Sequence, residues 1–415
     1  MADPVADRKP GPRGDPVADR AASGDGVDRP WPIFLLFCRL SLTAFGGPVA
    51  HLGLLRQELV RRRAWLNDGA FLELAAVANL LPGPNSTEVA MELGRRRAGR
   101  AGLIVAGLGF ILPAAVVALT AAWLYVEAGR LPPIQAALAG VKPVVVAIVV
   151  AAVGALAGSL RGKPALVVVA ALCLAGYLAG ISELLLLALA PLAALAWRAA
   201  RSGVLRDRAL AIWLPVLPTV GGSAAAPLLA PLGLGGLVGI FAVFLKAGAL
   251  LFGSGYVLLA FLRNDLVVGT GWLTDRQLLD AIAIGQATPG PLFTTATFIG
   301  YLLAGVPGAL VATVAIFLPA FVFVVLLEPI VRVLRARPWT SVALDGLSAA
   351  ALGLMAGVAI VLGREALAPG GSVDALSVGV FAASLIGLVS GRAGPTAIIA
   401  AGALLGLGRL ALAGA

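Results

Sequence analysis

The stretch from Phe71 to Gly94, FLELAAVANLLPGPNSTEVAMELG, has two apolar pieces on either side of Pro82-Gly83-Pro84. Each piece is shorter than the roughly 20 apolar residues that a membrane-spanning helix needs. Proline lacks a backbone N–H and glycine bends freely, so we expect the helix to break at this tripeptide. The stretch therefore predicts two half-helices that meet inside the membrane as a re-entrant hairpin. Its polar tip is expected at Asn85, Ser86 and Thr87.

The same pattern returns 207 positions later, where Leu278 to Pro291 reads LLDAIAIGQATPGP and aligns without a gap. Chemically similar residues recur at this constant spacing on both sides of the tripeptide. The matched positions are Pro82-Gly83-Pro84 with Pro289-Gly290-Pro291, Asn79 with Gln286, Glu73 with Asp280, Asp68 with Asp275, Trp65-Leu66 with Trp272-Leu273, Phe45-Gly46 with Phe252-Gly253, and Arg39 with Lys246. Repetition of this kind indicates a duplicated module.

The composition indicates that the duplicated module is embedded in a lipid membrane. Of the 415 residues, 60% are hydrophobic and 13% are charged, whereas soluble proteins are about 25% charged. We expect an all-α polytopic membrane protein. The net charge of +10 lies mainly in short loops, so it indicates orientation in the membrane rather than nucleic-acid binding. Cys38, Cys173 and the single histidine give no disulfide or metal framework, and no cofactor is expected.

Four segments divide the chain. Residues 1–30 are polar, contain PVADR twice and are predicted to be a disordered tail without an apolar signal-peptide core. Residues 31–208 form the first repeat, 209–232 a Pro- and Gly-rich connector, and 233–415 the second repeat. Each repeat is expected to hold about five spanning helices and one hairpin. The expected membrane segments outside the hairpins include 31–50, 101–126, 132–158, 164–180, 182–198, 309–331, 339–363, 373–390 and 394–412.

Loop charges predict that the two repeats have opposite orientations. Arginines cluster at 56–63 and again at 95–100, and a re-entrant hairpin between them leaves both clusters on the cytoplasmic side. The equivalent loop at 262–276 is nearly neutral and is expected outside. An inverted-topology repeat of this kind is the architecture of many secondary transporters.

Two intramembrane cations occupy equivalent positions in the repeats. A charge inside a membrane helix costs about 2.5–3.5 kcal/mol on insertion scales, so such residues are usually functional. We interpret Arg39 and Lys246 as a pair that faces a central anion site, with snorkelling or pairing to Glu73 and Asp280 as the alternative. Lys142 has no charged counterpart, and its role in the site or as a snorkelling residue stays open.

The two tripeptides are expected to supply the rest of the substrate site. A half-helix that begins after each break directs free N–H groups and a positive dipole end at the cavity. Side-chain donors next to the breaks add hydrogen bonds to an anion. The expected substrate-binding residues besides the cations are Pro82, Gly83, Pro84, Asn85, Ser86, Thr87, Gln286, Pro289, Gly290, Pro291 and Thr294. A purely structural kink is the alternative.

Two further groups are candidates for supporting roles. Gly46, Gly47, Gly253 and Gly255 lie in short turns and are predicted hinges, with close helix packing as the alternative. The candidates for proton coupling are Glu73, Glu88, Asp280 and His51. Glu88 and Glu92 are one helical turn apart, so either can instead pair with the arginines at 95–97. The sequence contains no phosphate-binding loop and no nucleophile–base set, so we do not expect an enzyme.

The motifs Phe45-Gly46-Gly47-Pro48, Trp65-Leu66 and Leu81-Pro82-Gly83-Pro84, with their second copies, resemble the chromate ion transporter family of the long, two-domain type. The resemblance covers nearly all of residues 34–410. It implies a multi-pass protein of the bacterial inner membrane that exports chromate and confers chromate resistance. A transporter of sulfate or another oxyanion is the first alternative, and a membrane-embedded enzyme or lipid-handling protein is the second. The lipid bilayer is the expected surrounding partner, and a homodimer stays open.

Overall fold

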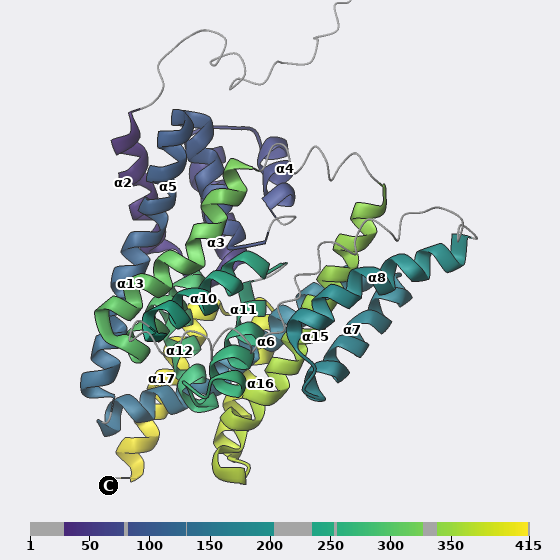
Figure 1. Ribbon diagram of the computed structural model, residues 1–415. Coiled ribbons are helices and arrows are strands. Elements are labelled where there is room, and N and C mark those ends of the chain that lie inside the picture. Colours follow the sequence, from purple (N-terminus) through teal and green to yellow (C-terminus); the bar gives the residue numbers. More distant parts are fainter. Residues whose placement is uncertain are drawn as a thin grey trace, which may run out of the picture.

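The computed structural model describes residues 29–78, 82–129, 131–202, 235–252, 255–326 and 338–413, and these residues are helical apart from short connections. Figure 1 shows the helices. The first half contains α2 (Pro30–Thr43), α3 (Gly47–Leu55), η1 (Arg56–Arg62), α4 (Asp68–Ala78), α5 (Asn85–Ala128), α6 (Pro132–Ala157), η2 (Gly158–Leu160), α7 (Pro164–Leu178) and α8 (Glu183–Ser202). The second half contains α10 (Gly235–Leu250), η6 (Gly255–Val257), α11 (Leu258–Leu262), η7 (Arg263–Gly269), α12 (Asp275–Ala287), η8 (Leu292–Thr294), α13 (Thr295–Val325), α15 (Pro338–Leu367), η9 (Pro369–Gly371), α16 (Ala375–Val389) and α17 (Pro395–Ala413).

Six of the described helices are long and apolar enough to cross a membrane. Their outer faces are apolar as well. On α5 the exposed side chains Ile104, Leu108, Leu112 and Val116 recur every four residues, as a lipid-facing stripe on a helix does. The chain is therefore an all-α, multi-pass membrane protein, as the composition predicts. The expected connector at 209–232 and nearly all of the expected tail lie outside the described residues.

Proline sets the start of many of these helices. Pro30, Pro132 and Pro164 each stand at the first helical position, where the missing N–H is not needed and the fixed φ angle favours the helix. The predicted boundaries at 132–158 and 164–180 are therefore close to those of α6 and α7. The predicted segment 31–50 is instead divided, because Gly46 has a φ of 97° between α2 and α3.

The helices α5 and α13 each contain a sharp reversal of the chain. In α5 the backbone leaves the helix at Ala98 and Gly99, and Gly94 then packs directly against the backbone of Gly102. Residues eight apart in a straight helix are about 12 Å apart, so this contact requires two antiparallel arms. The same arrangement occurs in α13, where Ala304 and Gly305 are non-helical. Gly300 and Gly308 make the equivalent contact.

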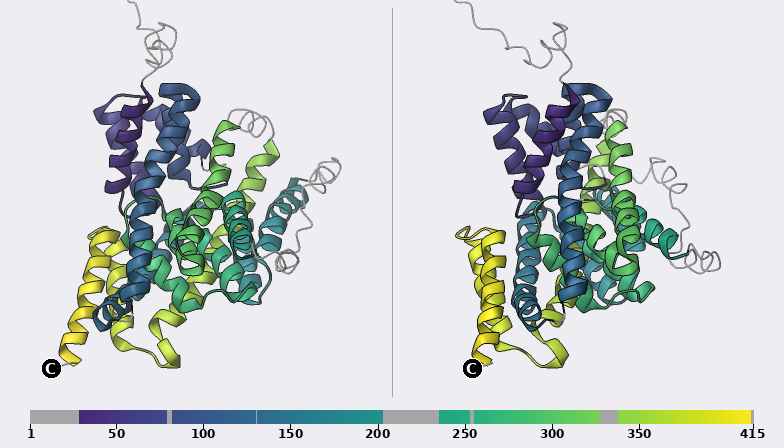
Figure 2. Two further views of the ribbon diagram at one scale, coloured as in Figure 1. Left: turned by 60° about the vertical axis from the view of Figure 1, so that its left-hand side comes forward. Right: turned by 90° about the vertical axis from the view of Figure 1, so that its left-hand side faces the viewer.

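The two halves of the chain are interleaved in space. At the centre α5 packs against α13, with α2 on the outside of α5 and α10 on α13. The helix α6 packs against α16 and α17 from the second half, while α15 packs against α7 and α8 from the first half. Figure 2 shows α17 alongside α6. Neither half therefore buries its helices without the other.

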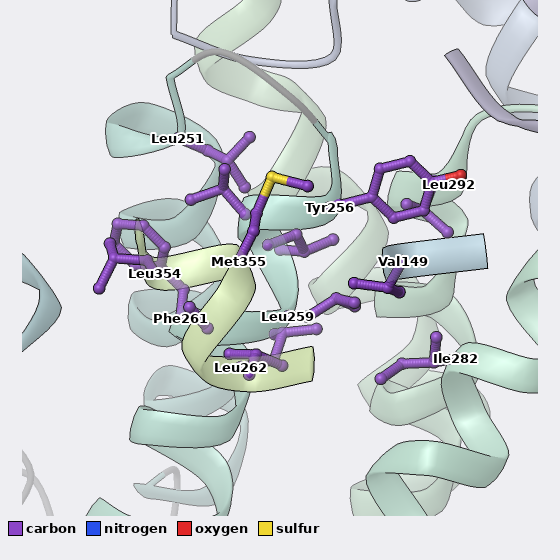
Figure 3. Packing of buried hydrophobic residues seen from close by; sticks show 14 of the residues in the cluster. Val149, Leu251, Tyr256, Leu259, Phe261, Leu262, Ile282, Leu292, Leu354 and Met355 are labelled. Carbon is purple, nitrogen blue, oxygen red and sulfur yellow. The ribbon is translucent and has the colours of Figure 1, made fainter. Parts of the chain in front are cut away.

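The largest apolar core lies where these helices meet. Figure 3 shows Leu259, Phe261 and Leu262 of α11 in this core together with Ile282 of α12 and Met355 of α15. Tyr256 in η6 belongs to the same core, and it is 7% exposed. The short elements η6 and α11, which follow the end of α10, are thus fixed by packing on all sides.

Candidate functional site

Both Pro-Gly-Pro tripeptides are non-helical. The first lies just before Asn85, where α5 begins, and the second separates α12, which ends at Ala287, from η8. Gly83 has a φ of 137° and Gly290 a φ of 97°, conformations that glycine adopts readily and other residues rarely adopt. The local chemistry of the tripeptides thus produces two breaks at the positions that the sequence predicts.

Each break is held by a hydrogen bond to the other half of the chain. The N–H of Gly83 donates to the carbonyl of Leu251, just after α10, over 2.8 Å. The N–H of Gly290 donates to the carbonyl of Ala44, just after α2, also over 2.8 Å. Because both donor and acceptor positions differ by the same 207 residues, the two bonds are equivalent. Each tripeptide is therefore positioned by the first helix of the opposite half.

Polar side chains connect the surroundings of the two breaks through α5. The hydroxyl of Ser41 donates to the carbonyl of Phe110 over 2.8 Å, and a Cβ placed on Gly290 would lie 3.2 Å from that hydroxyl oxygen. The buried His51 contacts the ring of Phe110 edge-on, and its Nδ1 lies 3.4 Å from Oγ of Ser86. The tip of the first hairpin and the second tripeptide thus converge on the same part of α5.

Several buried polar atoms beside the breaks have no hydrogen-bond partner within the described part of the chain. They are Thr87 Oγ1, both carboxyl oxygens of Glu88, Gln286 Nε2 and Thr295 Oγ1. Glu88 is 1% exposed, and a Cβ on Gly83 would collide with its carboxyl group. Buried polar groups are normally bonded, because leaving one without a partner costs about 1–3 kcal/mol in protein interiors. Hydrogen-bond donors at both breaks, and the carboxyl group of Glu88 at the first, are therefore available to a polar ligand.

The remaining predicted tip residues have different surroundings. Thr294 is buried, and its hydroxyl donates to the carbonyl of Pro291 over 2.8 Å, so this donor is already used. The N–H groups of Thr87 and Glu88 donate to the carbonyl of Pro84, which begins α5 in the usual way. Asn85 and Pro82 are half-buried at the same turn, and so is Pro289 at the second one. Asn79 lies outside the described residues.

The predicted hinge glycines lie next to the breaks. Gly46 and Gly47 have φ angles of 97° and 81° and separate α2 from α3. A Cβ on Gly47 would lie 2.9 Å from the hydroxyl of Tyr256, so glycine permits a close approach between the halves here. Gly255 is buried in η6 at the equivalent turn, and Gly253 falls outside the described residues.

The structure does not bring Arg39 and Lys246 together as the expected pair of anion ligands. Arg39 is exposed on α2, because the residues of this helix that pack against α5 lie on the opposite face. Lys246 is partly buried, and its Nζ lies 3.4 Å from Oε1 of Glu183 and also contacts Asp265. Two carboxylates thus already surround this lysine, and neither Glu73 nor Asp280 is its partner.

The proton-coupling candidates separate into two classes. Asp280 on α12 is 4% exposed, and it forms an ion pair of 2.9 Å with Lys142 on α6 and accepts a hydrogen bond of 3.0 Å from Tyr125 on α5. Glu73 is exposed on α4. Asp280 and Glu73 therefore do not belong with Glu88 and the other unpartnered atoms beside the breaks. His51 lies next to them, through its contact with Ser86.

Sequence reasoning missed the partners of Lys142, Lys246 and Asp280. Lys142 pairs with Asp280 across the two halves, and Glu92 pairs with Arg95 and Arg96, as one of the alternatives for Glu92 predicted. Glu183 has only one signal in the sequence, a lone acid at the start of an apolar segment. Within the described ranges, no group of three metal-ligating side chains is assembled.

Comparison with known proteins agrees with the resemblance in the motifs. The family model described as chromate transporter matches residues 31–197 and again 238–407. The chain is 34% identical to a chromate transport protein of Cupriavidus metallidurans over 81% of its own length and 83% of that protein. It is 35% identical to one from Pseudomonas aeruginosa over 85% of each chain. An uncharacterized transporter of Methanocaldococcus jannaschii is 26% identical over 83% of this chain and 87% of its own. No solved structure matches the chain. The resemblance is thereby confirmed: the chain belongs to the chromate transporter family.

Proposed function

We propose that this protein is a secondary active transporter that exports chromate, with the substrate bound where the two Pro-Gly-Pro breaks converge. The observation that carries the proposal is the pair of equivalent hydrogen bonds from Gly83 to Leu251 and from Gly290 to Ala44. These bonds hold two helix starts beside buried polar side chains, which are Thr87 and Glu88 at the first break and Gln286 and Thr295 at the second. The printed names of the relatives from Cupriavidus metallidurans and Pseudomonas aeruginosa supply the substrate class.

The chemistry of the breaks suits a tetrahedral dianion. The helices that follow Pro84 and Pro291 begin with N–H groups that have no carbonyl partner within the helix, and their dipoles favour negative charge. In this proposal, Asn85, Ser86 and Thr87 donate hydrogen bonds from the first tip, and Gln286 donates from the second. In this proposal neither Arg39, which is exposed on α2, nor Lys246, which Glu183 and Asp265 neutralise, contacts the anion.

We further propose an inverted-topology repeat in which Phe71–Gly94 and its second copy are re-entrant. Supporting this, Arg56–Asp68 and Arg263–Asp275 form ion pairs of 2.7 Å at positions 207 residues apart. The π-helical turns η1 and η7 have the same spacing. In this proposal each Pro-Gly-Pro break returns its hairpin to the side from which it came, and the reversal that follows in α5 or α13 directs the chain back into the membrane. Rocking of one repeat against the other would then open the site alternately to each side.

The membrane potential gives export its direction. A dianion that leaves a cell with a negative interior gains about 4.6 kcal/mol per 100 mV, from about 2.3 per charge. Glu88 is the proposed proton-exchanging group of the substrate site, because its carboxyl group has no partner beside Gly83. Taking up a proton there removes a negative charge from the path of the anion. The bacterial inner membrane is the proposed location.

Uptake of radioactive chromate into everted membrane vesicles tests this function, because export from the cell becomes uptake into such vesicles. We expect uptake that requires an inside-positive potential and that excess sulfate reduces less than unlabelled chromate does. Gly83→Leu is expected to abolish uptake, since any side chain there meets Glu88. Gly99→Leu is the matched control, because Gly99 also has a positive φ but faces open space.

Two results would contradict the proposal. Vesicles that take up sulfate but not chromate would assign the transporter to another oxyanion. Equal uptake by wild type and Gly83→Leu at equal expression would remove the substrate site from the tripeptides. Chromate tolerance of cells with and without the gene then tests whether export confers resistance.

A further inference from the structure

A second buried acidic group lies away from the tripeptides. We use the name Glu183 cluster for Glu183 at the start of α8, Lys246 on α10 and Asp265 in η7. The lysine Nζ contacts both carboxyl groups, with a distance of 3.4 Å to Oε1 of Glu183 and a shorter contact to Asp265. Glu183 is 1% exposed, so water does not screen this cluster on the side of α8.

The cluster holds more carboxyl groups than positive charges. Oε2 of Glu183 and Oδ2 of Asp265 are buried and have no hydrogen-bond partner among the described residues. Lys246 supplies one positive charge for two carboxylates. A buried carboxylate without a compensating charge is unfavourable by several kcal/mol, so the group takes up a proton instead.

The neighbouring charges do not correct this imbalance. Arg263, two residues before Asp265, is bound by Asp275 over 2.7 Å and is also next to the hydroxyl of Tyr177 on α7. On α15, which packs along α8, Asp345 forms an ion pair with Lys163. With all groups ionised, Lys246 and Arg263 face three carboxylates, so one proton restores neutrality.

We propose that Glu183 and Asp265 bind one proton between them, beside Lys246, and that this proton is coupled to transport. A proton fits this place better than a metal cation, because the lysine ammonium group already contacts both carboxyl groups and would repel a cation there. Glu183 is the main carrier, since it is the more buried acid and has the longer contact with the lysine. The coupling rests on the proposed transport function, whereas proton binding does not.

The fold provides a path from this proton to the substrate site. Lys246 lies little more than one helical turn before Leu251, whose carbonyl holds Gly83. Without the proton, two carboxylates attract Lys246. With the proton bound, only one carboxylate attracts it. Proton binding therefore changes the force that holds the end of α10, and with it the position of the first tripeptide.

Infrared spectroscopy of the purified protein tests proton binding without any substrate. We expect two C=O bands of protonated buried carboxyl groups in the wild type, one from Glu88, which Glu88→Gln removes, and one from the Glu183 cluster. The second band is the one that tests the proposal, and it disappears as the pH is raised. Glu183→Gln removes it, because Asp265 alone balances Lys246. Asp265→Asn also removes it, because Glu183 is then balanced. Loss in both single variants is a result that a merely structural role would not produce.

The matched control is Glu58→Gln. Glu58 lies 207 residues before Asp265, and its carboxyl group already pairs with Arg62 and Arg63. This variant is expected to keep the second band. A second band that is absent from the wild type at every pH, or unchanged in both cluster variants, would overturn the proposal. If Glu183→Gln does not purify as a monodisperse protein, Asp265→Asn alone tests the proposal. Loss of the band in that variant then supports the proposal, and an unchanged band overturns it.

Transport in proteoliposomes tests the coupling separately. Wild-type chromate flux is expected to respond to an imposed pH gradient, and Glu183→Gln is expected to reduce that response to the part that Glu88 contributes while keeping exchange of chromate down its gradient. An undiminished response in Glu183→Gln would refute the coupling. A wild type that binds the proton but moves no chromate would instead refute the proposed function and leave the proton site intact.

Discussion

Gly290→Ala is expected to destabilise the protein by about 2–5 kcal/mol. The φ of Gly290 is 97°, and a left-handed conformation costs a residue with a Cβ about 1–2 kcal/mol. The new methyl group would also overlap Cβ of Ala114 on α5, and overpacking of this kind costs about 1–3 kcal/mol. The steric cost comes from the methyl group of Ala114, whereas the backbone cost comes from the φ angle of residue 290. Removing that methyl group therefore removes the steric cost and leaves the backbone cost unchanged.

Ala114→Gly provides that separation. In this background the nearest remaining side-chain atom is Oγ of Ser41, at 3.2 Å from the new Cβ, so Gly290→Ala should cost only about 1–2 kcal/mol. Chemical unfolding of the purified protein in detergent measures all four members of this double-mutant cycle. Gly305→Ala is the control for the backbone part, because Gly305 has a φ of 62° and no atom within 4 Å of a Cβ. If Gly290→Ala costs the same with and without the methyl group of Ala114, the close approach of the tripeptide to α5 is refuted.

Three further outcomes are expected. Asp280→Asn should destabilise the protein by about 3–5 kcal/mol, because Lys142 loses its buried partner, and Lys142→Met in the same chain should recover most of that loss in unfolding measurements. Cysteines that replace the exposed Asp68 and Thr274 should react with a membrane-impermeant reagent from opposite sides, and labelling from the same side would end the inverted-repeat proposal. Arg39→Gln should retain chromate uptake in everted vesicles, since the side chain is exposed on α2, and loss of uptake at normal expression would return Arg39 to the anion site.

The local constraints in the sequence determined where the helices begin and break. Proline lacks an N–H and fixes φ, and glycine alone adopts positive φ without strain, so Pro82-Gly83-Pro84 interrupts a helix whatever surrounds it. The breaks and several helix boundaries are therefore predictable from residues near them. The membrane environment is predictable for a similar reason, because an apolar stretch of sufficient length partitions into lipid regardless of its partners.

Only the tertiary structure decided which residues face one another. Arg39 and Lys246 match in sequence, yet one is exposed and the other is enclosed by Glu183 and Asp265. Lys142 has no charged equivalent in the second half, and its partner Asp280 is 138 positions away. An ion pair depends on which helices pack together, and here α6 and α15 each pack with helices of the other half. Sequence spacing does not encode such an exchange, because shape and burial across the whole fold select the packing.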